Sequence, residues 1–278
     1  MNDWLLFDPL FRIPFLVGLL LAAGLSLVGT LLRLRNEWLA ALGLAQIAAA
    51  GGMVAAFLHG PAWVGAFGTA GIAMVVRSTL PKVGNNHYAI MIILGWSATL
   101  LLGAFMDHGR VIGESLLLGQ LYFTRMPHLI GAAIWLVLAL ACFPWLASRA
   151  LTARFFPDYH AANRQRVWPY RLVLALMTVM AAVFGTISIG AFPSFALLFV
   201  PSWVGFVLVD GWARSVVVSV LIGVVAYMIA FVVALLLDLP FGPVCTACLV
   251  MTGALRWCTA LRRRRGEWAG EEPPTVSV

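Results

Sequence analysis

Two cysteines, Cys245 and Cys248, lie three residues apart in the stretch LPFGPVCTACLV, in a chain of 278 residues with four cysteines. A C-x-x-C pair can bind a metal ion through thiolates, exchange electrons through a disulfide, or supply two small packing side chains. On a helix the two residues share one face, and small side chains there let membrane helices approach closely. A metal site needs further ligands, and none is evident nearby. Electron transfer needs a second pair, yet Cys142 and Cys258 fall in or beside different apolar segments. All three roles stay open.

The familiar motifs of catalysis and of energy coupling are missing from the sequence. There is no phosphate-binding G-x-x-x-x-G-K-[ST] loop, no H-E-x-x-H and no G-x-S-x-G, and Lys82 is the one lysine. The apolar segments hold almost no carboxylates, whereas proton-driven transporters usually carry ionisable groups within their spans. The histidines fall at segment ends or in loops, where we interpret them as polar boundary residues: His59, His87, His108, His128 and His160. We therefore expect a subunit that is driven by a partner, with no catalytic residues and no bound cofactor of its own.

The composition indicates a membrane protein. Hydrophobic residues make up 62% of the chain and charged residues only 10%, whereas roughly a quarter of a soluble domain is charged. Lipid must therefore be the solvent for much of the surface. The net charge of +7 comes from cations at the ends of apolar runs, not from a basic patch interleaved with aromatic residues, so no nucleic-acid partner is expected.

Nine apolar segments are candidates for crossing a bilayer, which takes about 20 residues. They lie near residues 13–32, 37–58, 62–80, 87–106, 128–148, 170–189, 191–209, 214–237 and 241–260. Gly190 and Pro193 are expected to break the sixth from the seventh. Acids rather than bases precede Arg12, so the first segment is expected to be retained as a span and not cleaved as a signal peptide. The sequence thus predicts an all-α, polytopic transmembrane helical bundle of about nine spans.

Basic residues, which are retained on the cytoplasmic side of a membrane, are distributed unevenly along the chain. Only Arg12, Arg110 and Arg125 fall on one side of the predicted topology. The other fifteen of the eighteen are Arg33, Arg35, Arg77, Lys82, Arg149, Arg154, Arg164, Arg166, Arg171, Arg214, Arg256 and Arg262 to Arg265. This asymmetry predicts an outer N-terminus and a cytoplasmic C-terminus.

A single transmembrane domain is expected over residues 1–260, followed at 261–278 by a basic, then polar cytoplasmic tail that we expect to be disordered. The longest polar connection, 150–169, is too short for a domain and is expected to contain a short amphipathic helix at the cytoplasmic surface. The outer connection, 107–127, is half apolar. Part of it is therefore expected to dip into the protein, where its backbone groups can be satisfied.

Four stretches, in order along the chain, carry a family resemblance. LLRLRNEWLAALGLAQIAAAGG is similar to a basic turn and second span, and LDLPFGP to the start of a last span. RFFPDYHAANRQR resembles a cytoplasmic coupling segment. GAFPSFALLFVPSWVG resembles a further span through Gly190, Ala196, Leu197, Leu198 and Pro201. Over about residues 11–258, the chain resembles the membrane permease subunit of the zinc/manganese/iron ABC importer family.

The resemblance implies an assembly in the bacterial inner membrane that imports a divalent metal such as zinc or manganese. Its partners would be a second permease copy or a paralogue, two cytoplasmic ATP-binding subunits and an extracytoplasmic solute-binding protein. ATP would be used by the partner subunits. The coupling helix, about residues 155–167, would seat in a groove of the ATPase. The contact residues implied there are Phe156, Pro157, Asp158, Tyr159 and Ala162.

The chain departs from the family at several charged positions. Leu42 and Gln46 stand where the family usually has an aspartate and a histidine one helical turn apart, and Gln120 replaces an acid of the outer segment. Asn86 and His87 replace the acidic start of the fourth span. A neutral amide can supply an oxygen, but zinc prefers cysteine, histidine and carboxylate ligands. The residues that bind a metal are therefore unknown from the sequence.

These departures leave several hypotheses open. The path can serve a bare divalent ion, a neutral chelate or a non-metal solute, or the chain can be the non-conducting half of a heterodimer. A membrane thiol-disulfide carrier is the alternative from another class. The candidate residues for the translocation path are Gln46, Gln120, Cys245 and Cys248.

Overall fold

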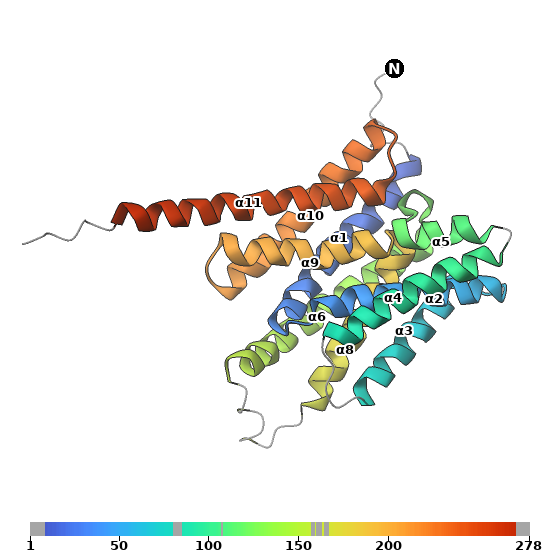
Figure 1. Cartoon of the computed structure of the whole chain (residues 1–278), viewed down its shortest axis with the longest axis horizontal. Helices are drawn as coiled ribbons and strands as arrows, with labels where there is room; N and C mark the ends of the chain where they lie inside the picture. The colour runs from blue at the N-terminus through green and yellow to red at the C-terminus, as the bar shows by residue number, and fades with distance from the viewer. Residues whose placement is uncertain are drawn as a thin grey trace, which may run out of the picture.

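The structure, a computed structural model, describes residues 9–79, 85–106, 108–156, 159, 163 and 167–270. Regular structure within these residues is helical, with no strand among them, which confirms the predicted all-α class. The helices are α1 (Pro9–Leu34), α2 (Trp38–Phe57), α3 (Ala62–Thr79), α4 (Asn85–Ala104), α5 (Gly109–Leu118), η2 (Leu121–Phe123), α6 (Met126–Phe155), α8 (Trp168–Ser188), α9 (Ala191–Leu208), α10 (Trp212–Leu236) and α11 (Phe241–Gly270). They form one bundle, from which the end of α11 projects (Figure 1).

Each of the nine predicted apolar segments coincides with a helix. In the described part of the chain, seven helices are long and apolar enough to cross a membrane. The third and ninth segments correspond to shorter apolar stretches, Ala62–Arg77 and Phe241–Ala254. The count of nine spans and the sides on which the termini lie therefore stay predictions.

Gly190 separates α8 from α9, as predicted. Its φ of 100° and ψ of 157° belong to a region of backbone space that is open in practice only to glycine. Pro193 follows in the first turn of α9, where the N–H that proline lacks has no partner within the helix. One apolar run of about 40 residues is thus divided into two helices.

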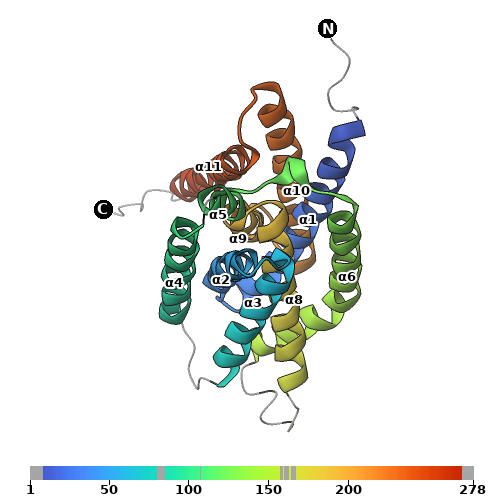
Figure 2. The same cartoon turned by 90° about the vertical axis from the view of Figure 1, so that its right-hand side faces the viewer.

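Helix α2 runs through the middle of the bundle, with α3, α4, α8 and α9 packed around it (Figure 2). Its buried residues are mostly alanine and glycine, and such small residues let membrane helices approach closely. A Cβ at Gly51 would meet the carbonyl oxygen of Gly65 in α3, and a Cβ at Gly95 in α4 would meet the backbone of Gln46. This close approach encloses the centre of α2 on more than one side.

The connection between α4 and α6 packs into the protein, which confirms the expectation for residues 107–127. Its apolar residues lie in α5 and η2, where Leu116 and Leu117 are each 6% exposed and Leu121 is 1% exposed. Between these elements, a Cβ at Gly119 would meet the carbonyl oxygen of Ile189. The connection is thereby held at the junction of α8 and α9.

Large apolar side chains cover the outside of the bundle. Ile93 of α4 is 64% exposed, Ile134 of α6 is 55% exposed and Leu221 of α10 is 55% exposed. Soluble monomers rarely expose apolar surface so broadly. The outer faces are therefore suited to contact with lipid, as in a multi-pass membrane protein.

Candidate functional site

Gln46, a candidate for the translocation path, is enclosed in the centre of α2. Its side chain is 0% exposed, and it is the one polar residue among the buried residues of that helix. Neither its Oε1 nor its Nε2 has a hydrogen-bond partner among the described residues. A buried amide without partners costs roughly 1–3 kcal/mol, so this position is costly for the fold.

Gln120 and the cysteine pair lie elsewhere in the fold. Gln120 is exposed and precedes η2, and Cys245 and Cys248 lie in the first turns of α11. Cys245 belongs to the core cluster built on α1, α9 and α10, whereas the residues flanking Gln46 belong to a second cluster. The structure therefore does not gather the four predicted path residues into one site.

Cys245 is 0% exposed and Cys248 is half-buried, and both thiols are free. Among the described residues, no group of three or more His, Cys, Asp or Glu side chains is placed to hold a metal ion. The burial of Cys245 among apolar side chains supports the packing role that the sequence left open.

Replacing both cysteines by alanine is expected to leave transport unchanged within about twofold. The expected cost is about 1 kcal/mol of unfolding free energy, mainly from the small cavity left by the buried sulfur of Cys245. Uptake and thermal unfolding of the C245A/C248A variant would measure both effects. Loss of uptake in a well-folded variant would contradict the packing role and return the thiols to the path or to redox exchange.

The predicted coupling segment begins where α6 ends at Phe155. Phe156 and Tyr159 are 65% and 45% exposed, and the backbone N–H of Asn163 donates to the Tyr159 carbonyl at 3.0 Å, the i to i+4 pattern of a helical turn. Exposed aromatic side chains of this kind are typical of contact surfaces. Three of the predicted contact residues lie outside the described residues: Pro157, Asp158 and Ala162.

A charged cluster that sequence reasoning missed joins the turn between α1 and α2 to its neighbours. Arg35 Nη2 contacts Glu37 Oε1 at 2.8 Å, and Arg77 Nη2 of α3 contacts Glu37 Oε2 at 2.6 Å. The Arg35 guanidinium lies over Tyr170 of α8, and that of Arg77 over Tyr88 of α4. Burial alone would lower the pKa of Arg35, but Glu37 and Tyr170 together raise the pKa above its ordinary value. We call these five residues the Glu37 cluster.

The Glu37 cluster links the turn between α1 and α2 to the helices α3, α4 and α8. Little in the sequence indicates this cluster, because Arg35 and Arg77 are also explained as basic residues of the cytoplasmic side. A single acid immediately before α2 is the feature that could have indicated it, since an acid at a helix N-terminus is stabilised there and attracts basic neighbours. The pairing with Arg77, 40 residues away, follows only from the packing of α2 on α3.

Comparison with known proteins places this arrangement in a family. A family model described as the ABC 3 transport family matches residues 8–256. Comparison with curated protein sequences finds no match.

Two solved structures have a similar fold. One is of PsaBC from Streptococcus pneumoniae in complex with Fab, with a TM-score of 0.79 and 12% identity over 91% of this chain and 92% of that chain. The other is described as a metal-chelate type ABC transporter in an inward-facing conformation, with a TM-score of 0.68 and 18% identity over 90% of this chain and 89% of that chain. At these identities the likeness concerns the fold, and the family model supplies the membership. Since that model spans most of the sequence and agrees with the resemblance seen in its motifs, the chain belongs to the ABC 3 transport family.

Proposed function

We propose that the chain is the permease subunit of an ATP-binding-cassette importer for a divalent metal ion or a metal complex. Its place among ABC transporter permeases rests on the family and on the fold. The metal cargo is supported by the resemblance of its motifs to zinc/manganese/iron permeases. It is supported also by the similar structure that is described as metal-chelate type.

The proposed assembly contains partners that supply energy and cargo. Separate cytoplasmic ATP-binding subunits would hydrolyse ATP and contact the segment that begins with the exposed Phe156 and Tyr159. A second permease copy or a paralogue and an extracytoplasmic solute-binding protein would complete the importer in a bacterial inner membrane. This chain would bind no cofactor of its own.

The observation that links the proposal to a particular residue is the unpartnered amide of Gln46. It corresponds to the position where the family usually has a histidine, and it is the polar exception in an apolar helix at the centre of the bundle. A buried polar group without a partner is uncommon in stable folds. The presence of this amide is explained if it contacts the transported solute or the water bound to that solute.

Replacement of Gln46 by leucine is expected to separate stability from transport. Removing the unpartnered amide should raise the free energy of unfolding by about 1 kcal/mol, because the cost of burying an amide without a hydrogen-bond partner is removed. Uptake should fall at least tenfold if the amide contacts the cargo. Greater stability with unchanged uptake would remove Gln46 from the path. Lower stability would mean that the amide has a partner within the assembly.

The cargo is tested by the metal content of cells that lack the chain, grown under metal restriction. Zinc, manganese, iron and copper are measured together. Selective loss of one metal, restored by the wild type but not by a variant disrupted at Pro157 and Asp158, is the expected result. Unchanged content of all four metals would contradict a metal cargo and direct the test to other solutes.

A further inference from the structure

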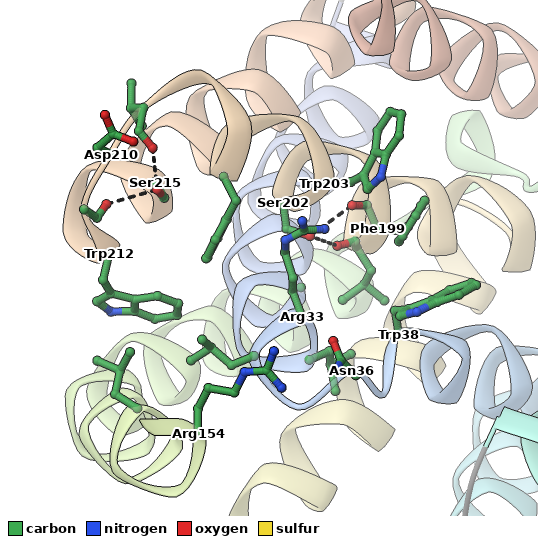
Figure 3. A pocket seen from close by; sticks show the side chains of 18 of the residues that line it. Arg33, Asn36, Trp38, Arg154, Phe199, Ser202, Trp203, Asp210, Trp212 and Ser215 are labelled. Carbon is green, nitrogen blue, oxygen red and sulfur yellow. Dashed lines mark hydrogen bonds between the residues drawn. The ribbon is translucent and has the colours of Figure 1, made fainter. Parts of the chain in front are cut away.

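A cleft of about 800 Å³ opens among six helices. Its walls come from the end of α1, the end of α6, the second half of α9 and the start of α10, together with the turn before α2, Trp38 at the start of α2 and Arg256 in the middle of α11 (Figure 3). This volume lies within the roughly 300–1,000 Å³ that is usual for sites binding small ligands. None of the predicted path residues lines it, so the cleft is separate from the proposed path.

The charge of the cleft is positive. Three arginines line it, Arg33, Arg154 and Arg256, against one lining acid, Asp210. Arg33 and Arg256 come from opposite ends of the sequence, and their like charges repel each other. Neither Arg33 nor Arg154 forms an ion pair with an acid among the described residues. An anion held between these guanidinium groups would relieve the repulsion.

Aromatic rings form the other part of the lining. Trp38, Phe199 and Trp203 lie in a row, with ring centroids 5.1 Å apart for the first pair and 6.1 Å for the second. The guanidinium of Arg256 lies 4.2 Å from the centroid of the Trp203 ring. That of Arg33 lies 5.3 Å from the centroid of the Phe206 ring. Tryptophan rings next to arginines are typical of protein surfaces at a membrane–water interface.

An apolar groove follows the same two helices away from the cleft. It has a volume of about 500 Å³ and lies between α10 and α11, where its lining includes Ile222, Thr252 and Cys248, a residue predicted for the path. Ile222 lies two turns from Ser215, and Thr252 one turn from Arg256, so each pair shares a side of its helix. Ser215 and Arg256 line the cleft. The apolar groove therefore continues from the cationic cleft along one side of α10 and α11.

We propose that the cleft binds the headgroup of an anionic phospholipid of the cytoplasmic leaflet, with an acyl chain lying in the groove between α10 and α11. On the predicted topology, every helix end that lines the cleft lies on the cytoplasmic side. Basic pockets between transmembrane helices on that side are suited to anionic headgroups. A soluble anion would need only the arginines, whereas a lipid also accounts for the aromatic wall and the apolar groove.

The site also adjoins the coupling segment. Leu151, Arg154 and Phe155, at the end of α6, line the cleft. A bound headgroup would hold the last turn of α6 against α1 and α10. This consequence rests on the proposed function, whereas the binding itself does not.

The test is a titration of the purified full chain, in phosphatidylcholine nanodiscs, with phosphatidylglycerol. Retained lipid is counted by native mass spectrometry after transfer to detergent. The variant R33Q/R256Q is expected to bind phosphatidylglycerol about 30-fold more weakly, the loss expected for two arginines that face an anionic lipid. The matched control is R149Q/R171Q, which removes the same charge on the same predicted side but outside the cleft, and it should bind as the wild type does. The variant R33K/R256K keeps both charges and should retain most of the binding.

Three outcomes would overturn the proposal. Equal weakening in R33Q/R256Q and R149Q/R171Q, with unchanged melting temperatures, would show a general charge effect. Full displacement of the lipid by millimolar inorganic phosphate would show a site for a soluble anion. Unchanged lipid binding in R33Q/R256Q, with loss of copurification of the ATP-binding subunit, would assign the cleft to the partner protein.

Discussion

Replacement of Gly190 by alanine is expected to destabilise the protein by about 2–6 kcal/mol, enough to lower the yield of folded protein. Two independent causes add. The backbone of Gly190, with φ 100° and ψ 157°, costs a non-glycine residue about 1–3 kcal/mol. A Cβ there would also meet the backbone of Leu118 and Gly119, and forcing that backbone apart costs about 1–3 kcal/mol more.

Gly211 provides the matched control for this prediction. Its φ of 94° and ψ of 134° demand a similar backbone, but a Cβ there would meet nothing within 4 Å. Alanine at Gly211 should therefore cost only the backbone strain, about 1–3 kcal/mol. Folded yield and thermal unfolding in detergent would measure both variants. Equal losses of stability in the Gly190 and Gly211 variants would contradict the close contact between the α8–α9 junction and the segment after α5.

Replacement of Glu37 by glutamine is expected to cost about 2–3 kcal/mol of unfolding free energy. The carboxylate pairs with two arginines, and the three side chains are 21%, 23% and 18% exposed for Glu37, Arg35 and Arg77. Removing one partner of a fully buried pair costs about 3–5 kcal/mol, because the remaining charge stays uncompensated. The partial exposure of this cluster reduces that cost.

The pair of Arg110 and Glu114 supplies the control for the Glu37 variant. Their atoms are 3.9 Å apart and their side chains are 90% and 59% exposed, so replacing Glu114 by glutamine should change thermal unfolding little. The double variant E37Q/R77Q should recover part of the loss, because one unpaired guanidinium is removed as well. A Glu37 variant as stable as the Glu114 variant would contradict the role of the cluster in joining α1, α2 and α3.

Local features of the sequence were sufficient to predict the all-helical class and the positions of its long apolar helices. A run of about 20 apolar residues has few alternatives to a helix in lipid, since a helix satisfies its own backbone. The break at Gly190 was predictable as well, because glycine and proline interrupt a helix through their own chemistry. The half-apolar composition of residues 107–127 likewise indicated that this connection packs into the bundle.

The sites were less predictable, because they depend on contacts between distant segments. Arg33 and Arg256 are predicted to lie on the cytoplasmic side, but no local pattern shows that they line one cleft. Gln46 was selected through correspondence with a family position, and its lack of partners emerges only once α3, α4 and α8 enclose α2. The Glu37 cluster depends in the same way on the packing of α3 against α2.

We propose that this chain carries a metal across a membrane when an ATP-binding subunit drives it. The most direct measurement is uptake of radioactive zinc and manganese, bare and chelated, into proteoliposomes that contain the chain and its ATP-binding subunit. ATP-dependent uptake of one of these forms is expected, and it should be lost when Pro157 and Asp158 are replaced together. ATP hydrolysis by the complex with no uptake of any metal form would contradict the proposal.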